Sequence, residues 1–108
     1  MSQITHVQID FAFSGTPTEY AQVAAHVAPA IAAVPGLVSK LWISSEESGR
    51  AGGAYLFADR AAATAYLEGP IIARLRSNPA VTDVSVRLFE VILGPSETTR
   101  GIRAASSP

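Results

Sequence analysis

Residues 35–59, PGLVSKLWISSEESGRAGGAYLFAD, form the stretch that decides the fold. Proline and glycine at its start end the preceding element, and the glycine-rich centre predicts a hairpin between two strands. Successive side chains of a strand point to opposite faces. One predicted face of this hairpin is aliphatic, and the other carries Lys40, Trp42, Tyr55 and Phe57. We expect helices to cover the aliphatic face, which leaves the aromatic face for a different partner.

The rest of the chain supplies one strand and one helix on each side of the hairpin. Apolar residues recur at helical spacing after Thr16, Pro17 and Glu19, a set that predicts a capping-box start, and Pro29 lies inside this helix. Alternating apolar and polar residues predict the two outer strands. In chain order the predicted elements are a strand (3–13), a helix (16–34), the hairpin, a helix in two pieces (59–67 and 71–76) and a strand (82–92).

This order predicts an α+β, ferredoxin-like β-α-β-β-α-β domain over residues 1–95, with both helices on one face of an antiparallel sheet. Residues 96–108 are small and polar without a periodic pattern and predict a tail that is either disordered or laid along a partner. The uncovered face would expose several aromatic side chains, a patch too large for a stable monomer. We therefore expect a homodimer in which two such sheets face each other and form a dimeric α/β barrel.

Composition excludes several classes of function. At 108 residues the chain is one domain, and its net charge of -1 gives no reason to expect nucleic acid as a partner. Without cysteine there is no disulfide, thiolate metal site or cysteine nucleophile. The two histidines lie on different predicted elements and lack the spacing of metal ligands, so no metal is expected. No signal peptide and no apolar run of about 20 residues is evident, which predicts a cytoplasmic protein without a membrane partner.

Several segments together resemble the YdhR-type monooxygenases of the dimeric α/β-barrel superfamily. The most specific are Lys40-Leu41-Trp42 and the run from Ala51 to Phe57, AGGAYLF, and the likeness covers residues 3–95. This resemblance implies a homodimer with a ligand cavity in each protomer. The superfamily includes monooxygenases that act on quinols and anthrone-like aromatic polyketides without metal or flavin, and also decarboxylases, cyclising enzymes and haem-degrading members. Of these activities we expect the first, in an enzyme that needs no cofactor.

The candidate catalytic residues are Asp10, His6 and Arg87. Asp10 and His6 alternate on one strand face, and either could deprotonate a phenol or quinol, since a base must reach the proton it removes. Arg87 could stabilise an oxyanion or a reduced oxygen species, because fixed positive charge counts most in a cavity of low dielectric. Alternatively, His6 lies in solvent. Arg87 and Lys40 could instead pair with Asp10 or Glu90, or reach out at the barrel rim.

The candidate substrate-binding residues share the predicted polar and aromatic faces. Aromatic side chains there would stack on a flat substrate, and Lys40 could stabilise its oxyanion. The alternative is that the aromatic residues form only the packed core of a dimer. The full set is Gln8, Lys40, Trp42, Tyr55, Phe57 and Phe89.

Three functions remain open from the sequence. The first is a cofactor-independent monooxygenase or related tailoring enzyme for an aromatic, quinol or polyketide-type small molecule. The second is a cyclase or isomerase that uses the same kind of cavity without oxygen, and the third is a dimer that binds a small molecule without catalysis. An apolar cavity with a few polar groups serves all three.

Overall fold

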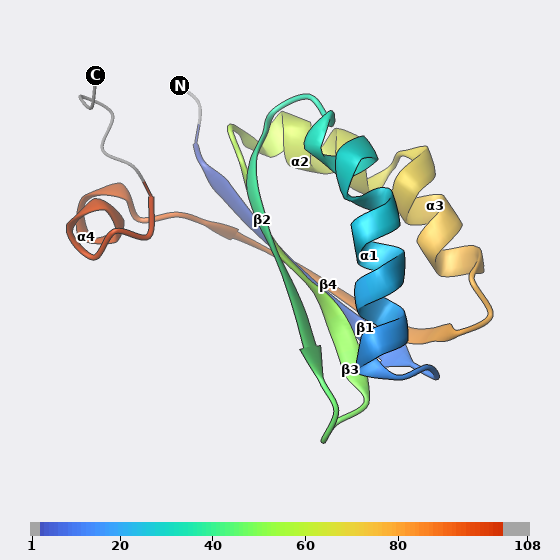
Figure 1. The fold of residues 1–108 in the computed structure, drawn as a ribbon. Coiled ribbons are helices and arrows are strands. Elements are labelled where there is room, and N and C mark those ends of the chain that lie inside the picture. Colours follow the sequence, from blue (N-terminus) through green and yellow to red (C-terminus); the bar gives the residue numbers. More distant parts are fainter. Residues whose placement is uncertain (1–2, 103–108) are drawn as a thin grey trace.

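The computed structural model describes residues 3–102, which form an antiparallel sheet with three helices over one face (Figure 1). The strand order is β2-β3-β1-β4, so β3 and β1 lie at the centre. This arrangement confirms the predicted ferredoxin-like fold. In chain order the elements are β1 (Thr5–Phe13), α1 (Pro17–Ala32), β2 (Leu37–Ser45), β3 (Arg50–Phe57), α2 (Arg60–Leu67), α3 (Pro70–Ser77), β4 (Val81–Glu90) and α4 (Leu93–Thr98).

The predicted helix starts are confirmed by their caps. At α1 the Thr16 hydroxyl accepts from the backbone N–H of Glu19 at 3.1 Å, and the Glu19 carboxylate accepts from the N–H of Thr16 at 2.7 Å. Asp59 caps α2 in the same way, through Ala62 N–H at 2.8 Å. These bonds satisfy backbone donors that have no partner within the helix. Both caps therefore fix the residue at which each helix begins after the strand before it.

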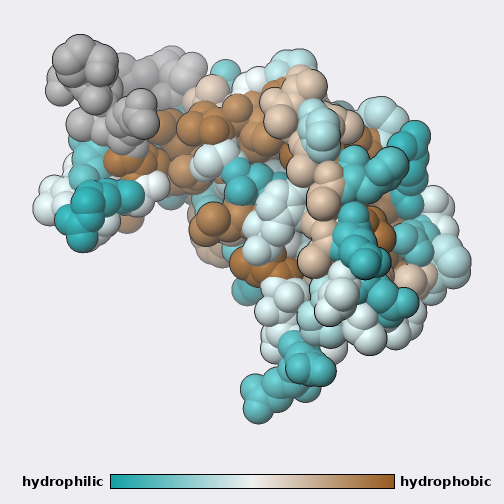
Figure 2. Space-filling model, viewed as in Figure 1, coloured by the Kyte–Doolittle hydropathy of each residue, from teal (hydrophilic) through white to brown (hydrophobic). Residues whose placement is uncertain are grey.

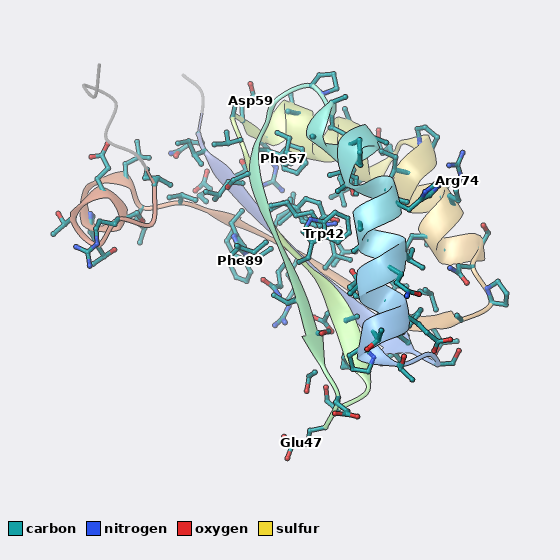
Figure 3. The ribbon with its side chains drawn as sticks, viewed as in Figure 1. Trp42, Glu47, Phe57, Asp59, Arg74 and Phe89 are labelled. Atoms are coloured by element: carbon teal, nitrogen blue, oxygen red, sulfur yellow. The ribbon has the colours of Figure 1, made fainter. Side chains whose placement is uncertain are left out.

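The prediction that helices cover the aliphatic face is confirmed for β1, where Val7, Ile9 and Phe11 are buried, but it is wrong for the hairpin. Tyr55 and Phe57 are 4% and 0% exposed and pack with Tyr66 of α2. Figure 3 shows Trp42 on the helix side of the sheet, with Phe89 on the other side. Alternation along a strand separates two faces but does not say which one the helices take. Aromatic rings bury the most apolar area per residue, so the aromatic face is the one covered.

A bulge in β2 also changes one predicted side-chain direction. Leu37 pairs with Phe57, but Ser39 already pairs with the next residue, Leu56, so the register shifts between them. Paired residues of neighbouring antiparallel strands point to the same face. Leu37 therefore shares the covered face with Lys40 and packs against the core, instead of lying beside Leu41 as strict alternation predicts.

The opposite face of the sheet, here called the open face, has no helix over it (Figure 1). Leu41 is 70% exposed and Phe89 is 51% exposed, and Ile43 is also exposed. Figure 2 shows apolar surface, in brown, beside β2. The open face is thus mainly aliphatic and polar, with Phe89 as its aromatic residue from the predicted set. The homodimer remains a prediction, now with different side chains at its contact.

Within the predicted tail, Ser96–Thr98 are helical and form the second half of α4. The Gly94-Pro95 pair reads as a stop, but both residues lie in the first turn of this helix. The N–H groups of a first turn have no acceptor within the helix, so proline is tolerated there. Figure 1 shows α4 beyond the end of β4, away from the other helices. The predicted tail also includes residues 103–108, which lie outside the described residues.

Candidate active site

A cavity of about 210 Å³ lies between the covered face of the sheet and helices α1 and α3. Its walls are mainly aliphatic and aromatic, which suits a flat apolar ligand. The sheet side contributes Ile9, Phe11, Lys40, Trp42, Gly52, Gly53 and Tyr55. The helix side contributes Tyr20, Val23, Ala24, Val27, Ala30, Ile31, Tyr66, Ile71, Ile72, Arg74, Leu75 and Asn78.

Lys40 places an amine inside this apolar lining. Its Nζ lies 3.2 Å from the ring centroid of Trp42 and 4.4 Å from that of Tyr55. Within residues 3–102 no carboxylate lies within ion-pair distance of this Nζ. Burial disfavours the charged form and lowers the pKa of Lys40 from 10.5 to about 7. At neutral pH the site therefore holds both the ammonium and the free amine.

Gly53 makes room for this lysine. A Cβ atom at position 53 would lie 2.4 Å from Cε of Lys40 and 3.1 Å from Cε1 of Tyr55. Separations of that kind are too short for carbon atoms, so any larger residue would push the lysine stem off the sheet. The AGG run in β3 thus serves the cavity directly, because it lets the Lys40 side chain lie across the strand.

Three tyrosines contribute neutral phenols to the cavity that holds the amine. The Tyr55 and Tyr66 hydroxyls are 3.0 Å apart, and the Tyr20 hydroxyl donates to the carbonyl of Gly52 at 3.2 Å. Burial raises the pKa of Tyr20 to about 12 and also raises the pKa of Tyr55 and of Tyr66. These groups stay protonated at neutral pH. Lys40 is therefore the lining group that exchanges a proton near neutral pH.

Sequence reasoning missed Tyr20, Tyr66 and Arg74 as lining residues. Tyr20 is one of the apolar residues that recur at helical spacing in α1, but this spacing does not show which residues line a cavity. Arg74 and Asn78, at the end of α3, place polar groups at the rim. The signal that could have found the tyrosines is that Tyr20 and Tyr66 both lie on predicted helices, where aromatic side chains can pack against the aromatic residues of a strand.

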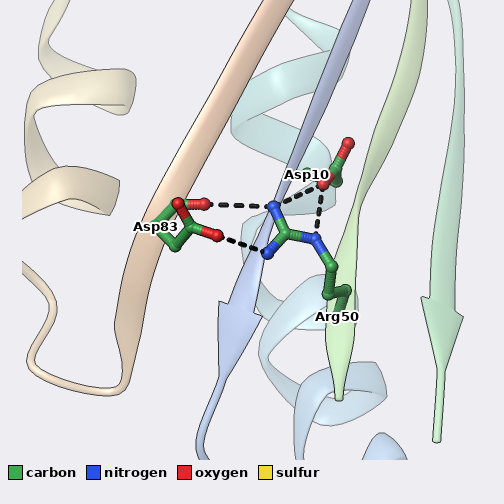
Figure 4. A network of polar contacts seen from close by, with 3 residues as sticks. All are labelled: Asp10, Arg50 and Asp83. Carbon is green, nitrogen blue, oxygen red and sulfur yellow. Dashed lines mark hydrogen bonds and ion pairs between the residues drawn. The ribbon is translucent and has the colours of Figure 1, made fainter. Parts of the chain in front are cut away.

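Asp10 lies on the open face, in an ion pair with Arg50 (Figure 4). Arg50 Nε donates to the Asp10 carboxylate at 2.6 Å, and its two other nitrogens donate to the carboxylate and carbonyl oxygens of Asp83 at 2.9 and 3.0 Å. Asp83 has a φ of 54° where the β1–β4 register shifts. This cluster ties three strands together, so the partner of Asp10 is Arg50 and not the predicted Arg87.

The other candidates from β1 and β4 lie on the open face as well. His6 Nε2 and Gln8 Oε1 are 3.1 Å apart, and the His6 and Phe89 rings are 6.1 Å apart. Arg87 pairs with Gln8 across the strands and is exposed. None of these residues lines the cavity among the described residues. The catalytic candidates therefore lie on the opposite face of the sheet from the cavity, and their roles remain predictions.

The substrate-binding candidates divide between the two faces. Lys40, Trp42 and Tyr55 come together in the cavity lining. Phe57 is fully buried and does not belong to the lining. It stacks on the lining residue Tyr55 at a centroid distance of 6.0 Å. Across residues 3–102 no group of three or more metal-ligating side chains is present. In the same part of the chain, none of the helices has the length and apolar character needed to span a membrane.

The family comparison agrees with this geometry. The family model described as "Putative mono-oxygenase ydhR" matches residues 6–102. The chain belongs to the YdhR mono-oxygenase family. The match covers all the strands except the first residue of β1, and it includes every residue that lines the cavity. Comparison with curated proteins found no match.

Solved structures show the same fold at low sequence identity. NE2512, a protein of unknown function from Nitrosomonas europaea, is 21% identical with a TM-score of 0.71, over 99% of this chain and 96% of its own. SnoaB, a cofactor-independent oxygenase from Streptomyces nogalater, is 22% identical with a TM-score of 0.63, over 84% and 94%. The heme-degrader MhuD from Mycobacterium tuberculosis is 28% identical with a TM-score of 0.61, over 82% and 96%.

Proposed function

We propose that this YdhR-family chain is a cofactor-independent monooxygenase for an aromatic small molecule, such as a quinol or an anthrone. The observation that carries the proposal is Lys40, whose amine lies in an apolar, aromatic-lined cavity without a carboxylate partner among residues 3–102. Strongly perturbed titrating groups in clefts are typical of active sites. This base replaces Asp10 and His6, which lie on the other face.

Lys40 would act first as a general base. The neutral amine takes a proton from an acidic O–H or C–H of the substrate, and a base whose pKa lies near the working pH does this most efficiently. The resulting ammonium stays beside the substrate anion and stabilises it in the low-dielectric cavity. The Trp42 and Tyr55 rings next to the amine would hold the substrate ring by stacking.

The electron-rich anion would then reduce oxygen itself. It passes an electron to O₂, the two radicals combine at carbon, and the peroxide loses water to leave a carbonyl. For an anthrone, one oxygen atom ends in the new quinone carbonyl and the other in water. The two hydrogens of the oxidised carbon supply that water, so no external reductant is needed. The protein supplies the base, the stacking surface and an apolar space.

The positions of the histidines favour this reaction over a haem-dependent one. SnoaB is a cofactor-independent oxygenase, whereas MhuD degrades heme, and both share the fold. Histidine is a common axial ligand of haem iron. In the described part of the chain, His6 faces the open side, His26 is exposed on α1, and neither lines the cavity. The lining suits an organic ring better than a haem whose iron is held by histidine.

Oxygen uptake with anthrone, in buffer containing EDTA and no added flavin, tests this function. We expect consumption of one O₂ for each anthraquinone formed, at a rate above the spontaneous oxidation. Turnover of the substrate under nitrogen, to a product that has gained no oxygen, would support a cyclase or isomerase instead. Saturable binding of anthrone without conversion would instead support a protein that binds small molecules without catalysis.

We also propose that the protein is a homodimer joined through the open face. The face exposes Leu41, Ile43 and Phe89 in the protomer, and apolar patches of this kind mark protein interfaces. In such a dimer Asp10, His6 and Arg87 would lie at or near the contact between sheets. Their roles would then be in assembly, with catalysis in the cavity on the other side of each sheet.

A further inference from the structure

Lys40 is the only lysine in the sequence, and every other strongly basic side chain is an arginine. It is also the side chain whose amine lies in the cavity over two aromatic rings. Arginine at the rim, such as Arg74, carries charge but cannot act as a nucleophile near neutral pH. The cavity lining thus contains one lysine amine, next to two aromatic rings.

We propose that Lys40 binds aromatic or conjugated aldehydes and ketones covalently, as imines. The site therefore has a second class of ligand besides the quinol or anthrone of the proposed oxygenase. A lysine that forms imines must be neutral, and desolvation in an apolar pocket is the usual way to achieve this. The inference depends on the cavity geometry and not on any turnover of oxygen.

The chemistry balances without an oxidant or reductant. The neutral amine attacks the carbonyl carbon, and a proton moves from nitrogen to oxygen to give a carbinolamine. Loss of that hydroxyl as water leaves the imine. The phenols of Tyr20, Tyr55 and Tyr66 line the same cavity and stay protonated. Tyr20 donates to Gly52 and one of the other two phenols donates to its neighbour, so one O–H of the Tyr55 and Tyr66 pair is left to donate to the carbonyl oxygen or to the departing hydroxyl.

The surroundings favour the imine once it has formed. The Trp42 and Tyr55 rings flank Nζ, so an aromatic carbonyl compound attached there would stack on them. Protonation of the imine withdraws electrons from the neighbouring carbon, which then releases a proton more readily. A bound ketone would therefore be activated for bond formation at that carbon, a reaction class distinct from oxygenation.

Reductive trapping tests the inference directly. The intact protein is incubated at pH 7 with 2-hydroxy-1-naphthaldehyde and sodium cyanoborohydride, and the modified residues are mapped by mass spectrometry. The matched control is Arg76→Lys, which adds an ordinary exposed amine on α3 outside the cavity lining. At pH 7 an exposed lysine is neutral in fewer than about one molecule in a thousand, whereas a group of pKa 7 is half neutral.

We expect Lys40 to be labelled at least about tenfold faster than the amine introduced at position 76, because its neutral fraction is far larger although its nucleophilicity is lower. Its labelling rate should level off above pH 7, while that of the introduced amine keeps rising. Equal rates, or labelling confined to the amino terminus, would overturn the inference. Oxygen uptake with anthrone is measured on unlabelled protein, so either result stands without the other.

Discussion

The covered face and the open face of this sheet hold their charged groups in opposite ways. On the covered face Lys40 has aromatic rings for neighbours, and no carboxylate in residues 3–102 pairs with it. On the open face Arg50 is paired with both Asp10 and Asp83. A paired charge ties strands together, whereas a buried unpaired charge costs stability and is retained for another reason. The cation that has aromatic rings and no carboxylate of the described residues beside it therefore marks the candidate site.

The sharpest test of this comparison sets Lys40→Met against Asp10→Asn. If Lys40 is the base, its loss should lower the rate of oxygen uptake with anthrone by about 100-fold or more, the usual contribution of a general base. Asp10→Asn should change that rate by less than about threefold, because Asp10 lies on the other face. Steady-state oxygen electrode measurements on both folded variants decide between them.

The pH profile of the unmodified enzyme provides the control. The base must be neutral, so kcat/KM should rise as pH increases through about 7 and then level off. A rate that falls through this range, or one abolished by Asp10→Asn and kept by Lys40→Met, would place the base on the open face after all.

The second test of the two faces measures dimer formation, for which we expect a smaller effect. Leu41 is 70% exposed on the open face, and Leu41→Glu would place two carboxylates in a sheet-to-sheet contact. We expect the dimer to weaken by about 100-fold, since a charge buried at an interface is left unpaired. Sedimentation equilibrium over a range of protein concentrations measures this.

Val23→Glu is the matched control for Leu41→Glu. Val23 is also an exposed aliphatic residue, at 48%, but it lies on α1 on the other side of the sheet. It should leave the association constant unchanged. A wild-type chain that sediments as a monomer, or equal effects of the two glutamates, would contradict the proposed contact.

The sequence was sufficient for the order of the elements from β1 to β4, but not for α4 or for the face of the sheet that the helices cover. Period-2 alternation put Tyr55 and Phe57 on one face, and the capping residues Thr16 and Asp59 located the helix starts. Neither observation says on which side a helix crosses the sheet. That choice depends on long-range packing of rings such as Tyr66 against Tyr55, which no local pattern contains.

The site shows the same limit. Lys40 and Trp42 were recognisable because they stand in a strand that should be buried. The pairing of Arg50 with Asp10 joins residues 40 positions apart, and the bulge that brings Asp83 to them is a tertiary feature. A strand face predicted from sequence therefore identifies candidate residues, while the split into a cavity set and an open-face set needs the fold.

Stability as a function of pH gives a third test of the two faces. The pKa of Lys40 falls from 10.5 in an exposed lysine to about 7 in the fold. Between these values the unfolded chain holds a proton that the folded chain has released, so this group makes stability rise with pH from about 7 to 10.5. Below pH 7 Lys40 is charged in both states, and the folded state then bears the full free-energy cost of burying the ammonium. Lys40→Met should therefore stabilise the protein at pH 7 by on the order of 2 kcal/mol.

The difference between Lys40→Met and wild type, measured by urea unfolding, should shrink as pH approaches 10. Using the difference cancels the ionisation of tyrosines common to both proteins. Arg50→Met is the counterpart on the open face and should lower the unfolding midpoint, because it leaves Asp10 and Asp83 without their shared partner. Destabilisation by Lys40→Met at every pH would show that the ammonium is compensated in solution.

The smallest expected effect concerns the polar groups that the covered face does satisfy. The Tyr55 and Tyr66 hydroxyls bond to each other at 3.0 Å in a buried setting. Tyr55→Phe removes one of them and should cost about 1 kcal/mol of stability, the usual worth of such a bond. Tyr66→Phe added to it should cost clearly less than it does alone, because the remaining hydroxyl has already lost its partner. Full additivity in urea unfolding would mean that each hydroxyl has another partner in solution, and the covered face would then be wetter than its lining indicates.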